Sequence, residues 1–180
     1  MAIPRSIYPN SGVKGLDVVM ANLQKELARI EGKTLEGLIR AGVEIRRATE
    51  KQIPLTPVDL GNLRASWFLV SIKGSEPDPE GHAGNFRNRP FKKMQNKAST
   101  LKAEHNATIK EAQQIVNGIK DPVVITGYSA NYAMWVHEME KSYPDVTWSR
   151  QGSGGKWFQA AIASNRNEIV RIVGKYAKIS

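Results

Sequence analysis

Apolar residues recur at spacings of three and four in two stretches near the start of the chain, which is the pattern of amphipathic helices. The first stretch covers residues 16–30 and the second covers residues 35–48. Residues 31–33, with the sequence EGK, predict a break between the two helices. Thr34 is suited to cap the second helix, and Pro54 marks its end.

The pattern changes to a period of two between Ala65 and Lys73, where aromatic and β-branched residues predict a strand that is buried on part of both faces. The segment VVITGY predicts a second strand that starts at Val123. Residues 131–136 have no decisive period and predict a third strand or a short helix. From Lys156 onward a helical period returns, which predicts a long C-terminal helix.

Residues 74–120 interrupt this order. Residues 74–90 are rich in glycine, proline and charge and predict a loop, and a thin apolar stripe then predicts a helix that ends near Lys120. We expect a single domain over residues 1–180 with an inserted arm at residues 74–120, since connections of this length are unusual in compact domains. The predicted fold class is α+β: a small, mainly antiparallel sheet packed with two N-terminal helices and a long C-terminal helix.

Composition restricts the chemistry. The chain has 180 residues, no cysteine and three histidines, which excludes disulfides, a thiolate nucleophile and cysteine-ligated metals. His137-Glu138 lacks the second histidine of a zinc motif because position 141 is lysine, and GSGGK fails the phosphate-loop pattern. A dispersed Ser-His-Asp triad stays open, although no local motif supports one. We expect no metal, no cofactor, no enzymatic activity and no membrane partner.

Basic residues exceed acidic ones by 26 to 17, which gives a net charge of +9. The excess is spread along the chain, as +3 over residues 1–72, +4 over residues 73–120 and +2 over residues 121–180. Its densest run lies beside two phenylalanines and comprises Arg87, Arg89, Lys92, Lys93 and Lys97. Such a run can contact nucleic-acid phosphates or an acidic protein neighbour, and charge alone does not separate the two.

Three segments taken together resemble one protein family. The sequence TPVDLGNLRASW at residues 56–67 resembles the TPVDTGNLRxS element of the bacteriophage neck and tail-completion family, with Leu60 in place of a small polar residue. GYSANYAMWVHE at residues 127–138 is similar to that family's YAxxVHEG element, with Met139 in place of the last glycine. GKWFQAAI at residues 155–162 is similar to the GxKFLxxAL opening of its final helix.

The residues of these segments also have physical interpretations of their own. Asp59 can accept backbone N–H bonds in a turn, and Gly61 permits a tight entry to the strand. Asn62 and Arg64 either fix this turn or reach a neighbouring subunit. Amphipathic groups in the second segment suit either a core edge or a subunit interface: Tyr132, Trp135 and His137. Glu138 is a further turn or interface candidate by its place in the motif.

The resemblance implies a structural virion protein that forms a homo-oligomeric ring, expected to be a hexamer, at the junction of head and tail. Its partners would be the portal or adaptor on one side and the tail-tube or tail-terminator protein on the other. Genomic DNA would pass through the ring non-specifically, and assembly would take place in the host cytoplasm. The alternative is a nucleic-acid-binding module outside the virion that uses the basic run at residues 87–97.

Overall fold

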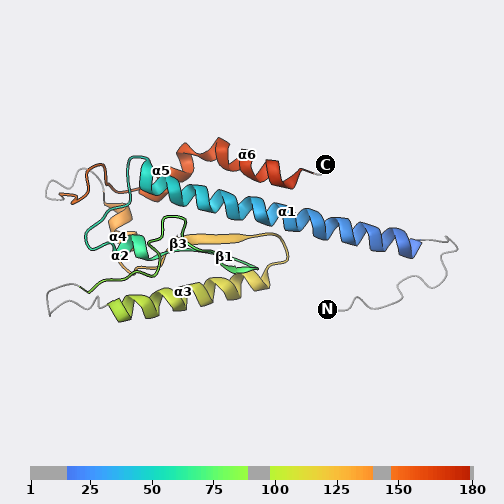
Figure 1. Cartoon of the computed structure of the whole chain (residues 1–180), viewed down its shortest axis with the longest axis horizontal. Helices are drawn as coiled ribbons and strands as arrows, with labels where there is room; N and C mark the ends of the chain where they lie inside the picture. Colours follow the sequence, from blue (N-terminus) through green and yellow to red (C-terminus); the bar gives the residue numbers. More distant parts are fainter. Residues whose placement is uncertain (1–15, 89–97, 140–146, 179–180) are drawn as a thin grey trace.

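The computed structural model describes residues 16–88, 98–139 and 147–178 (Figure 1). Along these residues the elements follow in the order α1 (Leu16–Lys51), α2 (Asn62–Ala65), β1 (Trp67–Ser71), β2 (Gly74–Ser75), α3 (Ala98–Gly118), β3 (Val124–Tyr128), α4 (Ala133–Glu138), α5 (Trp157–Ser164) and α6 (Arg166–Ala177).

The first helix is continuous over its 36 residues, so the predicted break at residues 31–33 is wrong and the two expected N-terminal helices are one. A glycine inside a helix costs only about 1 kcal/mol relative to alanine, which the flanking helical turns outweigh at Gly32. Thr34 does not cap a helix. Its hydroxyl donates to the carbonyl of Ile30 at 2.9 Å, one turn back in the same helix.

The sheet has the strand order β2-β1-β3, and both pairings are antiparallel, as predicted. Trp67 pairs with Tyr128 and Ser71 with Val124, so β1 and β3 match along their full length. The two predicted strands are confirmed. The edge strand β2 was predicted as loop, because two residues are too few to show a period. Residues 131–136, which were left open, contain the start of α4.

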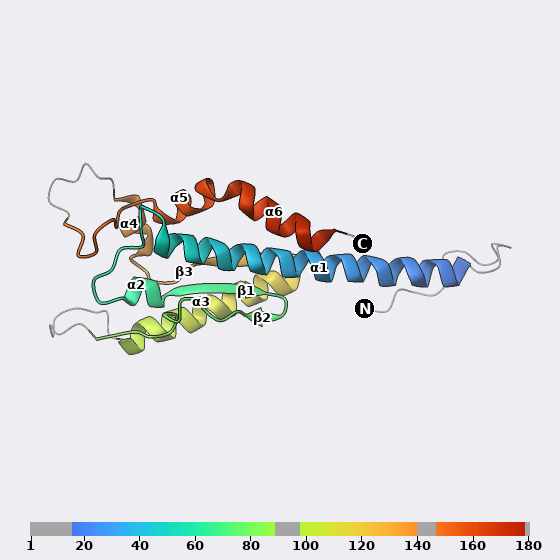
Figure 2. The same ribbon diagram turned by 45° about the horizontal axis from the view of Figure 1, so that its top comes forward.

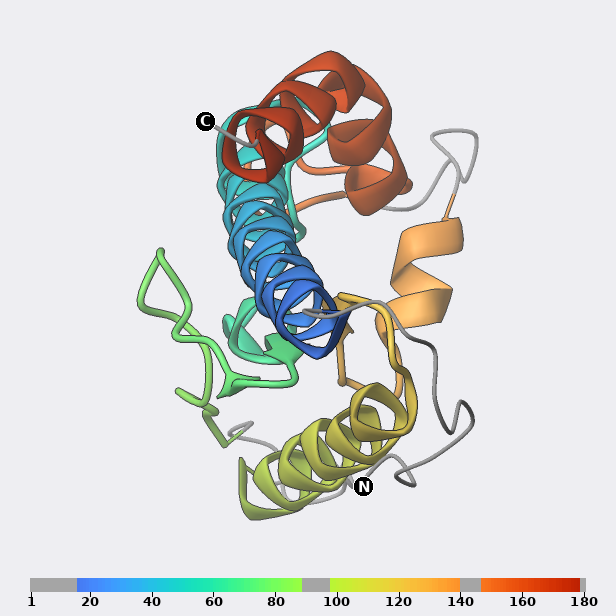
Figure 3. The ribbon, with the colours of Figure 1, turned by 90° about the vertical axis from the view of Figure 1, so that its right-hand side faces the viewer.

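Alternate residues of β1 pack against different helices, which explains why the strand is buried on both faces. Trp67 and Leu69 lie in one cluster with Leu35 and Ile39 of α1. On the other face, two further residues of β1 lie in a cluster with two residues of α3: Phe68, Val70, Ala112 and Val116. Figure 3 shows α1 and α3 on opposite sides of the sheet. The helical part of the expected arm at residues 74–120 is therefore a layer of the core.

The C-terminal region forms two helices where one long helix was expected, and they meet at Asn165. The side-chain amides of Asn165 and Gln52 exchange two hydrogen bonds, of 3.1 and 2.7 Å, which hold the break against the end of α1. α6 then runs along α1 on the side away from the sheet (Figure 2). Gly37 allows this close approach, because a Cβ there would lie 3.0 Å from the Cα of Val173.

Candidate functional site

The three segments that resemble the neck family are far apart in the sequence but meet at one end of the molecule. One buried cluster joins Leu63 of α2, Ala133 of α4 and Trp157 of α5. Tyr132 packs on the edge of the same cluster. Each of these four residues comes from one of the three segments. The fold therefore assembles the family-like sequence into one continuous structure, which we call the motif end.

The link between α4 and α5 depends on a glycine. The N–H of Lys156 donates to the carbonyl of His137 at 2.6 Å, and the Lys156 ammonium pairs with the Glu138 carboxylate. A Cβ on Gly155 would lie 1.8 Å from the carbonyl oxygen of Met139, so no larger residue fits this geometry. Hydrogen bonds from Lys156 and His137 lower the pKa of Glu138. Glu138 is thus ionised and paired at neutral pH.

His137 lies against the indole of Trp157, with ring centroids 4.9 Å apart in an edge-to-face arrangement. Its Nδ1 is 2.9 Å from Glu138. Among the described residues, neither Nε2 of His137 nor Nε1 of Trp157 has a hydrogen-bond partner, although both atoms are buried. Both residues line a hollow of about 230 Å³, together with Tyr128, Met134 and others. The motif end therefore has unused hydrogen-bonding capacity beside an apolar hollow.

Two large apolar side chains next to this hollow are directed to the surface. Met134 is 71% exposed and Trp135 is 76% exposed, both on α4. Clustered exposed apolar and aromatic groups are typical of surfaces that bind another protein, because burying them there removes apolar area from water. This arrangement suits contact with another protein.

The turn before β1 is fixed by Asn62, whose side chain bonds both to the N–H of Arg87, at 2.7 Å, and to its carbonyl, at 2.8 Å. Gly61 has a φ of 85°, which confirms that the tight entry requires glycine. Arg64 pairs with Glu50 at 2.9 Å. Asp59, Arg64 and Arg87 line a second hollow, of about 510 Å³. Within the chain, Asn62 and Arg64 therefore serve the fold.

The basic run is described only at its start. Arg87 is exposed and is anchored through its backbone to Asn62. The other four members lie outside the described residues: Arg89, Lys92, Lys93 and Lys97. The anchoring places the beginning of the run on the same side of the molecule as the turn that precedes β1.

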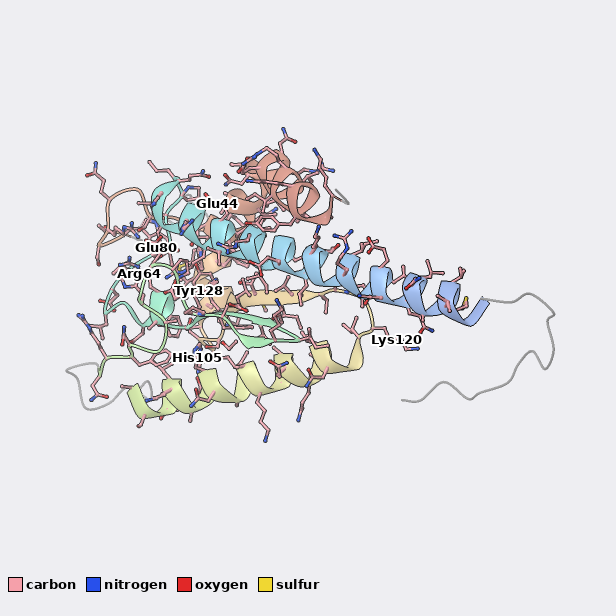
Figure 4. The ribbon with its side chains drawn as sticks, turned by 45° about the vertical axis from the view of Figure 1, so that its right-hand side comes forward. Glu44, Arg64, Glu80, His105, Lys120 and Tyr128 are labelled. Carbon is pink, nitrogen blue, oxygen red and sulfur yellow. The ribbon has the colours of Figure 1, made fainter. Side chains whose placement is uncertain are left out.

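Sequence reasoning missed a network of buried charges beside the motif end. Arg46 has no exposed side-chain surface and pairs with Glu50 at 2.7 Å and with Asp78 at 3.0 Å. Glu50 also accepts from Arg64 at 2.9 Å and from Arg150 at 2.8 Å. Figure 4 shows Arg64 and Tyr128 between α1 and α3. The spacing of these residues could have indicated the network, because residues 39, 42, 46 and 50 follow at intervals of three and four and share the core face of α1.

Electrostatics in this network favours the charged forms. Burial alone would lower the pKa of Arg46, but Tyr128, Asp78 and Glu50 outweigh burial and raise it. Burial would raise the pKa of Asp78, but the hydrogen bonds from Arg46 and from backbone N–H groups lower it. Arg46 and Asp78 are therefore ionised and paired, which is an arrangement for holding α1, β1 and the loop at residues 76–83 together.

Comparisons with protein-family models, with curated proteins and with solved structures found no match for this chain. Over the described ranges, no three histidine or acidic side chains are grouped so as to hold a metal ion. No helix in the described part of the chain is long and apolar enough to cross a membrane.

Proposed function

We propose that this chain is a structural, non-enzymatic protein of a tailed bacteriophage virion, and that copies of it form a ring in the neck between the DNA-filled head and the tail. The observation that carries the proposal is the motif end. Three segments that resemble one neck family meet there, and Met134 and Trp135 remain exposed beside them. Fold maintenance alone explains the buried residues of these segments but gives no reason for the exposed pair.

A ring requires two different surfaces on each copy, because a closed cyclic assembly joins one patch to another patch on the next copy. The exposed α4 pair is suited to be one of these surfaces. We propose a hexamer whose neighbours are the portal or adaptor and the tail tube or tail terminator. A net charge of +9 reduces repulsion from DNA in the channel without a dedicated site, since non-specific contacts with phosphate act through charge alone.

The test is a phage that lacks this gene, complemented with variants of it. Without the protein, we expect DNA-filled heads and separate tails in negative-stain images. Trp135→Ala should give the same unjoined particles, because it removes an exposed interface side chain without disturbing the core. Val170→Ala is the matched control, since Val170 is 66% exposed on α6 and belongs neither to the buried cluster nor to the apolar hollow of the motif end.

Joined, infectious particles from the deletion strain would refute the neck assignment. The nucleic-acid alternative makes a different prediction for a variant with alanine at all five positions of the basic run. If that variant assembles normally but its purified form no longer binds DNA, the chain is a nucleic-acid-binding module. If the variant fails to join heads to tails, the basic run is required for virion assembly.

A further inference from the structure

The first part of α1 carries an apolar stripe that the rest of the described chain leaves uncovered. Val19, Leu23 and Leu27 are 61%, 52% and 50% exposed, and Ile30 is partly buried. We call these four residues the N-terminal stripe. Figures 1 and 2 show this part of α1 extending beyond α6, the sheet and α3. A helical extension with little packing is marginal in water, so this one needs a partner surface.

The stripe continues the side of α1 on which α6 packs. Residues seven apart lie on nearly the same face of a helix, and Gly37 faces α6, with its Cβ position 3.1 Å from Cβ of Tyr176. Stepping back by seven gives Ile30 and then Leu23. α6 ends at Ala177, where its contact with α1 stops. A further helix antiparallel to α1, placed in line with α6, would cover the stripe.

The spacing of the stripe matches itself when it is reversed. Apolar residues occupy positions 16, 19, 23, 27 and 30, with intervals of three, four, four and three. If two copies pair antiparallel about Leu23, each Leu23 faces its equivalent, Val19 lies opposite Leu27, and position 16 lies opposite Ile30. Every layer of such a pair is apolar on both sides, which is the requirement for a helix–helix seam.

The charges of this segment also suit pairing with itself. Residues 17–33 contain three acidic and three basic residues and are neutral within a chain of net charge +9. A second copy would therefore meet a neutral segment here, whereas repulsion is expected between other parts of two basic chains.

We propose that a second copy of this chain covers the N-terminal stripe, in a two-fold antiparallel dimer centred on Leu23. The inference goes beyond the proposed function, because it concerns the chain in solution and needs no virion component. A seam of this length is at the small end of specific interfaces, so the dimer is reversible and forms as the protein concentration rises.

Disulfide trapping tests the register, and the absence of cysteine makes each introduced thiol unique. In purified full-length protein, Leu23→Cys should form a disulfide-linked dimer under mild oxidation. Val19→Cys and Leu27→Cys should not do so separately, but a mixture of the two should. Because a facing thiol has a millimolar effective concentration, we expect the Leu23→Cys dimer to form roughly tenfold or more faster than that of an unpaired position.

Val18→Cys is the unpaired control, because Val18 is 58% exposed but lies on a different face of α1. Far-UV circular dichroism shows that each variant is folded, and sedimentation shows whether Leu23→Lys makes the wild-type dimer monomeric. Equal trapping of Val19→Cys and Leu23→Cys would indicate parallel pairing and overturn the proposal. The proposal would also be overturned if the wild-type chain stays monomeric at all concentrations, or if Leu23→Cys forms the disulfide-linked dimer no faster than Val18→Cys. Either result would indicate that another segment or another protein covers the stripe.

Discussion

Arg46 places a positive charge in the interior, where the guanidinium lies 5.6 Å from the centre of the Trp67 ring and 5.9 Å from that of Tyr128. A buried ion pair adds little net stability compared with apolar packing, but removing one partner leaves a charge without compensation. Glu50 is the critical acceptor, because three arginines donate to it. The network therefore makes α1, α2 and the loop around Arg150 depend on one carboxylate.

Glu50→Gln should reduce the free energy of unfolding by about 2–3 kcal/mol, because the buried Arg46 keeps only Asp78 as a counter-charge and the partly exposed Arg64 and Arg150 lose their pairs with Glu50. Urea denaturation followed by circular dichroism measures the loss. Glu44→Gln is the matched control on the same helix. Its pair with Arg47 is exposed, at 3.5 Å, and its loss should cost less than about 1 kcal/mol. Equal effects of the two variants would show that the network is not a structural centre.

His105 should make the stability depend on pH. Burial lowers the pKa of His105 below its ordinary value of 6.5, against a smaller opposing effect from the backbone of Ser66. Below pH 6.5, His105 therefore binds a proton more readily in the unfolded chain than in the folded chain. The contribution of His105 to the free energy of unfolding is fully present above pH 6.5 and decreases as the pH falls towards the pKa of His105 in the folded state.

Urea midpoints measured at intervals between pH 7.5 and pH 5 should show this decrease, and His105→Gln should make it smaller. The other two histidines remain in that variant and provide the internal control. An unchanged pH dependence in His105→Gln would contradict the assignment. His105 also accepts or donates a hydrogen bond at 2.8 Å with Ser129, so the variant is compared with wild type at pH 7.5 as well.

Some of these residue roles could be predicted from the sequence and others could not. Gly61 was predicted from turn chemistry, which is local. The partners of Asn62 and Arg64 were not, because Arg87 and Glu50 are brought to them by the fold. Arg46 and Glu50 lie on the core face of α1, but the spacing of apolar residues does not show that a charged side chain is buried on that face.

At the scale of elements, aromatic and β-branched residues located β1 and β3 correctly, because such side chains pack well on the faces of a sheet that lies between α1 and α3. Helix ends were less predictable. Gly32 does not break α1, whereas Asn165 separates α5 from α6 without a glycine or a proline. At Gly32 the flanking helical turns outweigh the cost of the glycine. At Asn165 the hydrogen bonds with Gln52, a residue distant in sequence, hold the break, and the local sequence gives no sign of them.

The continuity of α1 can be tested by comparing two glycines within it. Gly32→Ala should raise the free energy of unfolding by about 0.5–1 kcal/mol, because its Cβ would meet no atom within 4 Å and alanine favours the helix. Gly42→Ala should lower it by about 1–3 kcal/mol, since its Cβ would lie 2.3 Å from a methyl carbon of Leu69. Urea denaturation measures both. Destabilisation by Gly32→Ala would show that the helix is interrupted there.

At the scale of the whole molecule, α6, α1, the sheet and α3 form successive layers, and the first turns of α1 project beyond them (Figures 1 and 3). The motif end lies at the opposite end of α1. The sequence identified the segments that compose that end but not their meeting, because no local pattern records that Leu63, Ala133 and Trp157 share a cluster. The motif end and the projecting first turns of α1 therefore lie at opposite ends of the molecule, and the described residues of those turns are not part of the cluster at the motif end.

Deletion of residues 1–27 should separate association from folding. Wild-type protein should have a thermal midpoint that rises with protein concentration, because dimerisation stabilises the folded state by mass action. The shortened chain should have a midpoint that is independent of concentration and equal to the wild-type value at high dilution. Calorimetry over a range of concentrations measures both. A shortened chain that is unfolded at high dilution would show that the projecting turns belong to the body.

The hydrogen bonds between Gln52 and Asn165 join residues 113 apart in the chain, and those between Glu50 and Arg150 join residues 100 apart. α1 is synthesised early and β1 follows soon after it, but α5 and α6, which cover the other side of α1, leave the ribosome much later. Contacts so distant in sequence slow folding, since the intervening chain must be ordered first. The side of α1 that contacts α5 and α6 therefore stays exposed until translation is nearly complete, and chaperone binding to the nascent chain is expected during that interval.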